Sequence, residues 1–510
     1  MSTSIALNLV FYSLGLRFFT LDDAYIVLKS SENFIEYGEL FSYNVMDENT
    51  NAITSFLFYL ISIIIVAPIL MVGAPLVESY TFVVFTFNFF CLLNTARDFY
   101  QIMLNTFTRT TSRFILVFFA TLYPILVIWT NGLETSLGLF LVVRIARKLL
   151  EGEYRGLHLN VILLILTRPD LGLSVLIVLF TLIFTKSLSN LKYLIEGVSV
   201  FLIPIIITKI VTGEFLTSSI SRVPIGGNED IYYKLISAVK NLLRAPVYFA
   251  NFSVPHDGFN ALSNFIPSSI KFFSMGLFLY FLSLTAGRVL FLYRTVSDFP
   301  RYLENIHFGK MTIFLYLMSL ITVSSLTGTG LGEFNRYFVF FYVIALILIL
   351  ISEPKLIHLG AIKSLLLVNL LMMPAAFVEV GSSITLNNQV LYPVAKKVQK
   401  IANERDIVML DSAGLISILG KGKIIDVYGL GTQRYSKIHG DFKQVYRLIN
   451  KDRPDFIVAW KMDKPTYYLD SAHYELALVN AKLIPVFSRR ESYFGKNSYP
   501  ELTIYRVNYS

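Results

Sequence analysis

Two consecutive aspartates, Asp22 and Asp23, stand where the first apolar stretch of the chain ends. Carboxylates resist leaving water, so an acidic pair beside apolar segments is costly to keep there without a use. Such a carboxylate can take a proton from a reacting hydroxyl, or it can bind an ion. The alternative is that one aspartate only caps a following helix, although two in a row exceed what a cap needs.

Other polar residues interrupt the apolar stretches further along. Glu134 lies two residues after Gly132 and begins an apolar segment, where a glutamate also stabilises a helix start. Arg168 and Asp170 flank Pro169, which breaks the apolar region 157–186. The two charges either form a structural ion pair or bind something, and the planar fork of an arginine suits a phosphate.

Arg336 opens a later apolar segment, directly after a glycine-rich loop at 328–332. Arginines are disfavoured on the outer side of a membrane, where the loops described below place this residue. It is therefore a candidate contact for an anionic partner, and the alternative is an anchor for lipid headgroups.

The composition predicts a polytopic α-helical membrane protein. Of the 510 residues, 55% are hydrophobic and 15% are charged, against about 25% charged residues in ordinary soluble domains. Apolar windows recur up to about residue 380, and we expect about eleven to thirteen membrane spans. The candidate spans lie near 4–20, 52–73, 79–96, 114–130, 134–150, 157–167, 172–186, 194–211, 266–293, 311–328, 336–352 and 360–378.

Two domains are expected from the change in composition near residue 385. Residues 1–380 form the membrane domain, with a first outer loop at 22–51 and a long outer loop at 212–265. Residues 385–510 are more polar and alternate short strands with helices, which predicts a small α/β domain. Basic loops mark the cytoplasmic side, so this domain is expected outside the cytoplasm. The first outer loop is expected to hold an amphipathic helix on the membrane surface.

Several function classes lack their signatures. The sequence has no phosphate-binding loop of the P-loop type, no nucleophile elbow and no His/Cys cluster with zinc spacing. The net charge of +9 comes from basic residues between apolar segments, which does not favour nucleic-acid binding. No cofactor or metal is indicated, although a divalent metal is not excluded.

The sequence resembles the GT-C class of integral-membrane glycosyltransferases, and most closely the branch of the mycobacterial terminal β-arabinofuranosyltransferase and its relatives. The resemblance covers most of the chain, in segments that keep their order and spacing. These segments are Asp22-Asp23-Ala24-Tyr25-Ile26, Gly132-Leu133-Glu134-Thr135, Arg168-Pro169-Asp170, Asn335-Arg336-Tyr337, Asp411-Ser412-Ala413-Gly414 and Ile425-Asp426-Val427-Tyr428-Gly429-Leu430.

The resemblance implies a multi-pass plasma-membrane enzyme with its active site on the extracytoplasmic face. It implies transfer of a sugar from a polyprenyl-phosphate donor to an envelope glycan, lipid or protein acceptor. Asp22 or Asp23 would take the proton of the attacking hydroxyl, and arginines would stabilise the leaving phosphate. The implied donor site consists of Arg168, Asp170, Arg336, Glu134 and Tyr337.

Two other functions remain open at this point. A secondary transporter or lipid flippase would use the acidic and arginine residues as a relay, but it needs polar residues deep in several spans. A scaffold protein with a receptor-like outer domain would leave Asp22, Arg168 and Arg336 unconnected in space.

Overall fold

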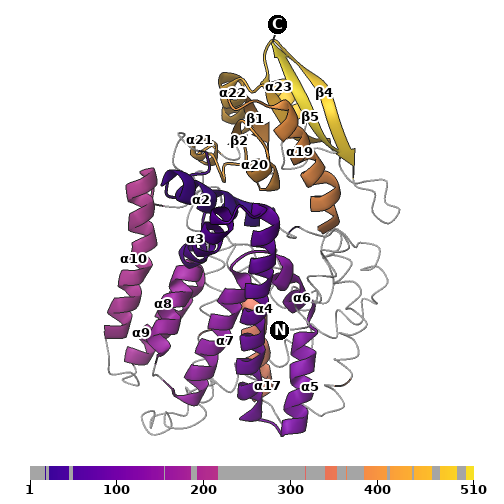
Figure 1. Cartoon of the computed structure of the whole chain (residues 1–510). Coiled ribbons are helices and arrows are strands. Elements are labelled where there is room, and N and C mark those ends of the chain that lie inside the picture. Colours follow the sequence, from indigo (N-terminus) through magenta and orange to yellow (C-terminus); the bar gives the residue numbers. More distant parts are fainter. Residues whose placement is uncertain are drawn as a thin grey trace.

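The computed structural model describes residues 18, 22–44, 50–153, 156–184, 192–215, 316, 339–352, 363, 384–410, 414–438, 441–461, 471–490 and 501–509. Figure 1 shows an assembly of helices with an α/β unit above it and helix α2 at the junction between them. The helices of the lower part are α2 (Ala24–Tyr37), α3 (Phe56–Met71), α4 (Leu76–Leu104), α5 (Arg109–Ala120), α6 (Tyr123–Thr130), α7 (Thr135–Glu151), α8 (Leu157–Thr167), α9 (Pro169–Phe184), α10 (Lys192–Thr212) and α17 (Val339–Ser352).

Local sequence signals set several helix ends. Helix α2 ends at Gly38, whose positive φ of 73° and backbone N–H to the Phe34 carbonyl make a left-handed C-cap. Helix α3 begins after Ser55, whose hydroxyl accepts the Phe58 N–H. Between α8 and α9 the helix breaks at Pro169, as the sequence predicts.

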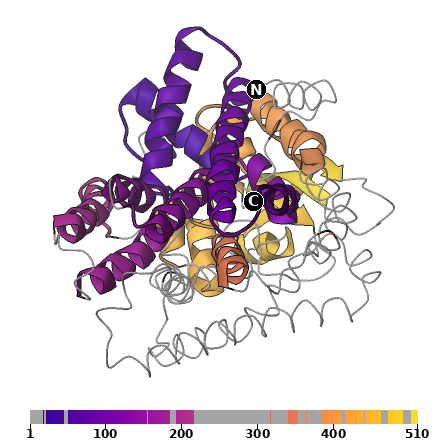
Figure 2. The same ribbon diagram turned by 90° about the horizontal axis from the view of Figure 1, so that it is seen from below.

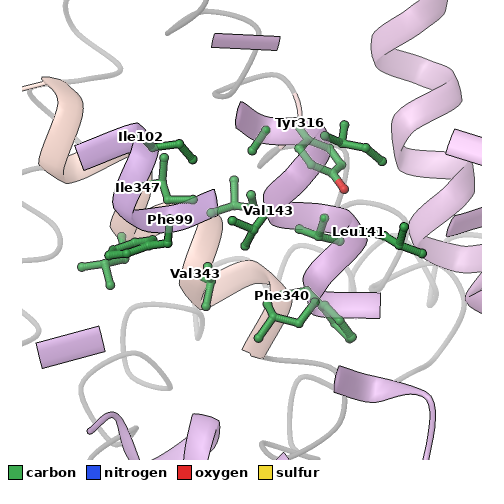
Figure 3. Packing of buried hydrophobic residues seen from close by; sticks show 14 of the residues in the cluster. Phe99, Ile102, Leu141, Val143, Tyr316, Phe340, Val343 and Ile347 are labelled. Atoms are coloured by element: carbon green, nitrogen blue, oxygen red, sulfur yellow. The ribbon is translucent and has the colours of Figure 1, made fainter. Parts of the chain in front are cut away.

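The core of the helical part surrounds α7, which is buried along most of its length. Figure 3 shows how α4, α7 and α17 pack there. The labelled side chains are Phe99, Ile102, Leu141, Val143, Tyr316, Phe340, Val343 and Ile347, all of them buried. Segments far apart in the sequence therefore share one apolar cluster.

The α/β unit is built on a five-stranded mixed sheet with the strand order β2-β1-β3-β5-β4. Strands β1, β2 and β3 are parallel, whereas β5 runs antiparallel to both β3 and β4. The elements are η2 (Asn387–Leu391), α19 (Tyr392–Ile401), β1 (Ile407–Leu410), α20 (Leu415–Leu419), β2 (Lys423–Asp426), α21 (Gln433–Ser436), α22 (Phe442–Asp452), β3 (Phe456–Lys461), α23 (Ser471–Ala477), β4 (Ala481–Arg490) and β5 (Glu501–Tyr509). The three parallel strands lie on the short apolar runs 407–410, 423–427 and 456–459, which the sequence pattern predicts as strands.

The two faces of the sheet bury different partners, because side chains alternate along each strand. Met409 and Ile425 point to a cluster with α22 and α23. Val408 and Leu410 point to the other face, into a cluster that also contains α2, α3, α19 and α20. The α/β unit and the first helices thus share one apolar core, and α2 lies between α3 and α20 with its apolar face inside the protein.

The prediction of a polytopic membrane protein with about eleven to thirteen spans is wrong. Within the described ranges, two helices are long and apolar enough to cross a membrane, at Leu76–Leu104 and Leu194–Thr212. The apolar helices Phe56–Met71, Leu157–Thr167 and, within α9, Pro169–Phe180 are shorter. The spans predicted at 4–20, 266–293, 311–328 and 360–378 lie almost wholly outside the described residues.

The error has a physical reason. A helix that is apolar on all sides is compatible with lipid and equally with the interior of a helix assembly. Helix α17 is of the second kind, because its sequence is apolar throughout, its described side chains are buried and it packs on α4 and α7. In the view from below, the orange ribbon of α17 lies beside the purple helices (Figure 2). Helix α8 has 11 residues, which gives about 17 Å against the ~30 Å of a hydrocarbon core.

Candidate active site

The carboxylate of Asp22 contacts the α/β unit at the start of α20. Its Oδ2 accepts the Gly414 backbone N–H at 2.9 Å, and its Oδ1 accepts the Leu415 N–H at 2.7 Å. Gly414 is required by this approach, because a Cβ there would lie 2.3 Å from Asp22 Oδ1. The contact therefore joins the beginning of α2 to the loop that follows strand β1.

The surroundings of Asp22 favour its protonated form. Burial raises the pKa of Asp22 to about 6, and the amide hydrogen bonds from Leu415 and Gly414 oppose part of that rise. The negative charges of Asp23 and Asp426 raise this pKa further. A carboxyl group with such a pKa exchanges protons near neutral pH, which is the property required of a general base or acid.

A network of hydrogen bonds supports this contact from the other side. The Tyr43 hydroxyl is hydrogen-bonded to the Ser417 side chain, and the Ser417 hydroxyl donates to the Gly414 carbonyl at 2.6 Å. The ring of Tyr43 lies against Gly431, where a Cβ would come within 2.5 Å of it. Burial and the charges of Asp426 and Asp22 raise the pKa of Tyr43, so its hydroxyl stays a donor.

Asp426 ends strand β2 and is fully buried. Its carboxylate accepts the backbone N–H groups of Tyr428 and Gly431, both at 2.8 Å. The neighbouring carbonyl of Ile424 accepts a hydrogen bond from Asn44 Nδ2 at 2.6 Å. The first loop is thus fastened to the carboxyl ends of β1 and β2, where open parallel sheets bind their ligands.

Asp23 occupies the N-cap position of α2, but its side chain makes no capping hydrogen bond. If Asp23 were a simple helix cap, its side chain would accept a hydrogen bond from the first turn of α2, and this bond is not formed. Asp23 is partly exposed and adds its negative charge to the field at Asp22.

Arg168, Asp170 and Glu134 lie together. Arg168 Nε and Nη2 donate to the two Asp170 oxygens at 2.9 and 2.6 Å, and Nη1 lies 3.6 Å from Glu134 Oε1. The Arg168 side chain is almost fully buried, with Phe340 of α17 beside it. This bidentate geometry is that of a structural ion pair.

The structure brings three of the predicted donor-site residues together, and none of the three is among the groups that act on the Asp22 pKa. The groups that act on the Asp22 pKa are Asp23 at the N-cap of α2 and, in the α/β unit, Asp426 and the amides of Gly414 and Leu415. Arg336 and Tyr337 lie outside the described residues. Their predicted roles stay predictions.

No family model and no curated protein matches this sequence. Function is therefore inferred from the residues and their geometry.

The sequence reasoning did not predict Tyr43, Ser417 or the amides of Gly414 and Leu415 as part of the site. A local signal existed for Asp426, a charged residue that ends a short apolar strand before a glycine-rich turn. Nothing local marks Tyr43, because its role depends on a partner near residue 417. Within the described ranges, no three His, Cys, Asp or Glu residues are grouped as a metal site.

The raised pKa of Asp22 predicts a specific dependence of stability on pH. The folded protein holds the Asp22 proton up to about pH 6, whereas the unfolded chain releases it near 3.8. Folding therefore gains from this group below pH 3.8, and the gain is lost as the pH rises to 6. The free energy of unfolding should fall by about 3 kcal/mol over this range.

Unfolding of the wild type and of Asp22→Asn, measured at pH 4 and pH 7, tests this prediction. The wild type should lose stability relative to the variant between the two pH values. An unchanged difference between the two proteins would show that Asp22 titrates normally.

Proposed function

We propose that the protein is a glycosyltransferase that takes a sugar from a polyprenyl-phosphate donor and uses Asp22 as its general base. One observation carries the proposal: the Asp22 carboxylate is held in place by two backbone amides and has a pKa of about 6. A base with a pKa near the working pH combines an ionised form with a useful affinity for the proton.

The proposed reaction is a direct displacement. The acceptor hydroxyl attacks the anomeric carbon while the bond from that carbon to the phosphate oxygen breaks, and the polyprenyl phosphate leaves with the electron pair. Asp22 takes the hydroxyl proton. The two amides use one lone pair on each Asp22 oxygen, so acceptor capacity remains on both. The anomeric centre is inverted.

Arg168 is better assigned to structure than to the donor phosphate. Its fork is occupied by Asp170 on two nitrogens, and a phosphate would have to displace that carboxylate. Glu134 adds a second negative charge beside it. We therefore keep Arg336 and Tyr337 as the donor-phosphate residues of the proposal, together with the glycine-rich loop before them.

A lipid-linked donor requires contact with a membrane, and α10 supports that part of the proposal. Its apolar stretch Leu194–Thr212 has a mean hydropathy of 2.2, and only 11% of it is buried. Large apolar side chains are exposed along this helix, namely Ile195, Val198, Leu202, Ile203, Ile206 and Ile210. Exposed apolar surface of this extent marks a membrane or protein contact.

The C-terminal end of α10 lies against the α/β unit, at the same junction as Asp22. Glu214 forms an ion pair with Lys437 at 2.8 Å, and Gln433 Nε2 donates to the Thr212 carbonyl at 3.5 Å. Asn51 of the first loop donates to Thr208 of α10 at 2.7 Å. A donor whose tail lies beside α10 would thus present its phosphate near the first loop.

The proposal is tested with the full chain in lipid vesicles that contain polyprenyl-phosphate sugars labelled in the sugar. We expect transfer of label to an envelope glycan acceptor and release of unlabelled polyprenyl phosphate. Water-soluble nucleotide sugars serve as the comparison and should give no transfer. Transfer from nucleotide sugars alone, or from no donor at all, would contradict the proposal.

A further inference from the structure

The contact between Asp22 and the α/β unit is part of a continuous hydrogen-bond chain that includes both backbone and side chains. Tyr43 is bonded to Ser417, Ser417 donates to the Gly414 carbonyl, and the Gly414 N–H donates to Asp22. This series of hydrogen bonds begins at Tyr43 and ends at Asp22, both in the first loop, and it passes through α20 of the α/β unit between them. A displacement of either unit would therefore break it.

The close approach of the first loop to the α/β unit depends on two glycines. Gly414 and Gly431 each stand where a Cβ would overlap the first loop, at 2.0 Å from the Asp22 carbonyl oxygen and at 2.5 Å from the Tyr43 ring. Neither glycine has a positive φ, so backbone conformation does not explain them. Close approach of the first loop does.

We propose that the α/β unit is a positioning element of the active site, which holds the Asp22 carboxylate in place through the Gly414 and Leu415 amides and the Tyr43–Ser417 pair. This inference rests on the proposed function, because it assigns the positioned carboxylate to sugar transfer. Gly414, Tyr43 and Ser417 act through Asp22 and are positioning residues. The carboxyl edge of β1 and β2 is thus occupied by a segment of the same chain.

Within the described part of the chain, the charged and titratable groups that act on this carboxylate come from three places. Asp23 is the N-cap of α2, Asp426 ends β2 and Tyr43 belongs to the loop after α2. The two amides of α20 are the donors that oppose these negative charges. Loss of the α20 contact would therefore leave Asp22 in a different field and in a different position.

The first test replaces Gly414 by alanine, which forces Asp22 away from the amides, and measures kcat/KM for sugar transfer against pH. We expect a fall of about 10²-fold, because a displacement near 1 Å has that cost in other active sites. The acidic limb of the profile should move above about pH 6, because the two amide hydrogen bonds lower the Asp22 pKa and burial keeps it raised. Tyr43→Phe keeps the ring and should give a smaller fall in the same direction.

Gly420→Ala is the matched control. Gly420 ends α20 and is also crowded, with a Cβ position 2.6 Å from the Ile416 carbonyl oxygen, but the nearest atoms belong to α19 and α20 and not to the first loop. This variant reports general damage to α20, so it should keep the acidic limb near pH 6 even if its stability falls. A shift of the limb in Gly420→Ala as large as in Gly414→Ala would overturn the inference.

The second test does not depend on activity. Hydrogen exchange of the full chain should become faster at residues 22–28 in Gly414→Ala and at 414–419 in Asp22→Ala, while helix α22 keeps its rate. Faster exchange at both segments, together with an altered pH profile of sugar transfer, supports the inference. Faster exchange at both segments with an unaltered pH profile and an unaltered rate of sugar transfer overturns the positioning role. Absence of transfer by the wild type from any donor overturns the proposed function, and this inference with it, whatever the exchange shows.

Discussion

Replacing Asp22 by asparagine should lower kcat for sugar transfer by about 10²–10⁴-fold, the usual effect of losing a general base. Asparagine keeps the size of the side chain but cannot take the hydroxyl proton. It also offers one acceptor oxygen to the two amides that now bind two carboxylate oxygens. The KM for the donor should change little, because Asp22 is assigned to the acceptor proton. Steady-state kinetics in vesicles measure both constants.

Asp23→Asn is the matched control for this prediction. Asp23 is the neighbouring residue of the same type, it lies at the N-cap of α2 and it makes no capping hydrogen bond. We expect less than about a tenfold loss, since the proton acceptor is kept. Full activity of Asp22→Asn, or a larger loss in Asp23→Asn, would move the base away from Asp22.

Replacing Arg168 by methionine should destabilise the protein by about 3–5 kcal/mol, because it leaves the carboxylates of Asp170 and Glu134 buried without their cation. Both arginine nitrogens that face Asp170 are within 2.9 Å of it. The Arg168 side chain is 4% exposed, so water cannot replace the pairing. Chemical denaturation of the purified protein in detergent measures the change.

Two further variants make this result specific. Lys192→Met breaks an ion pair whose lysine is 71% exposed, and it should change stability by less than about 1 kcal/mol. The triple change Arg168→Met, Asp170→Asn and Glu134→Gln removes the buried charges together and should recover most of the loss. If Arg168→Met instead keeps its stability and loses donor binding, Arg168 belongs to the donor site.

Local patterns were sufficient for part of the fold. The expected strand segments in the C-terminal region coincide with β1, β2 and β3, because short apolar runs between polar turns have few other conformations. The helix after Asp23 also forms as predicted, although its apolar face lies inside the protein. A window of apolar residues does not reveal whether the helix meets lipid or other helices, and this ambiguity explains the wrong span count.

For the site, too, local sequence patterns identified one residue but not its partners, which are distant in the sequence. Asp22 stood out because a carboxylate beside apolar residues is costly wherever it folds. Its partners could not be predicted, because Gly414 is 392 positions away in the sequence and donates only a backbone amide. A backbone donor has no side chain that would identify it, and the glycine there could equally have belonged to a turn.

The separation of these partners also sets the order in which the site is completed during synthesis. At about 5–20 residues per second, a ribosome needs roughly 20–80 seconds to reach the second partner after the first. Throughout that interval the carboxylate of Asp22 lacks both amides, and the inner face of α2 lacks α20. If the proposed function holds, a newborn chain lacks activity until the α/β unit has folded, and chains truncated before residue 414 should accumulate as aggregation-prone products.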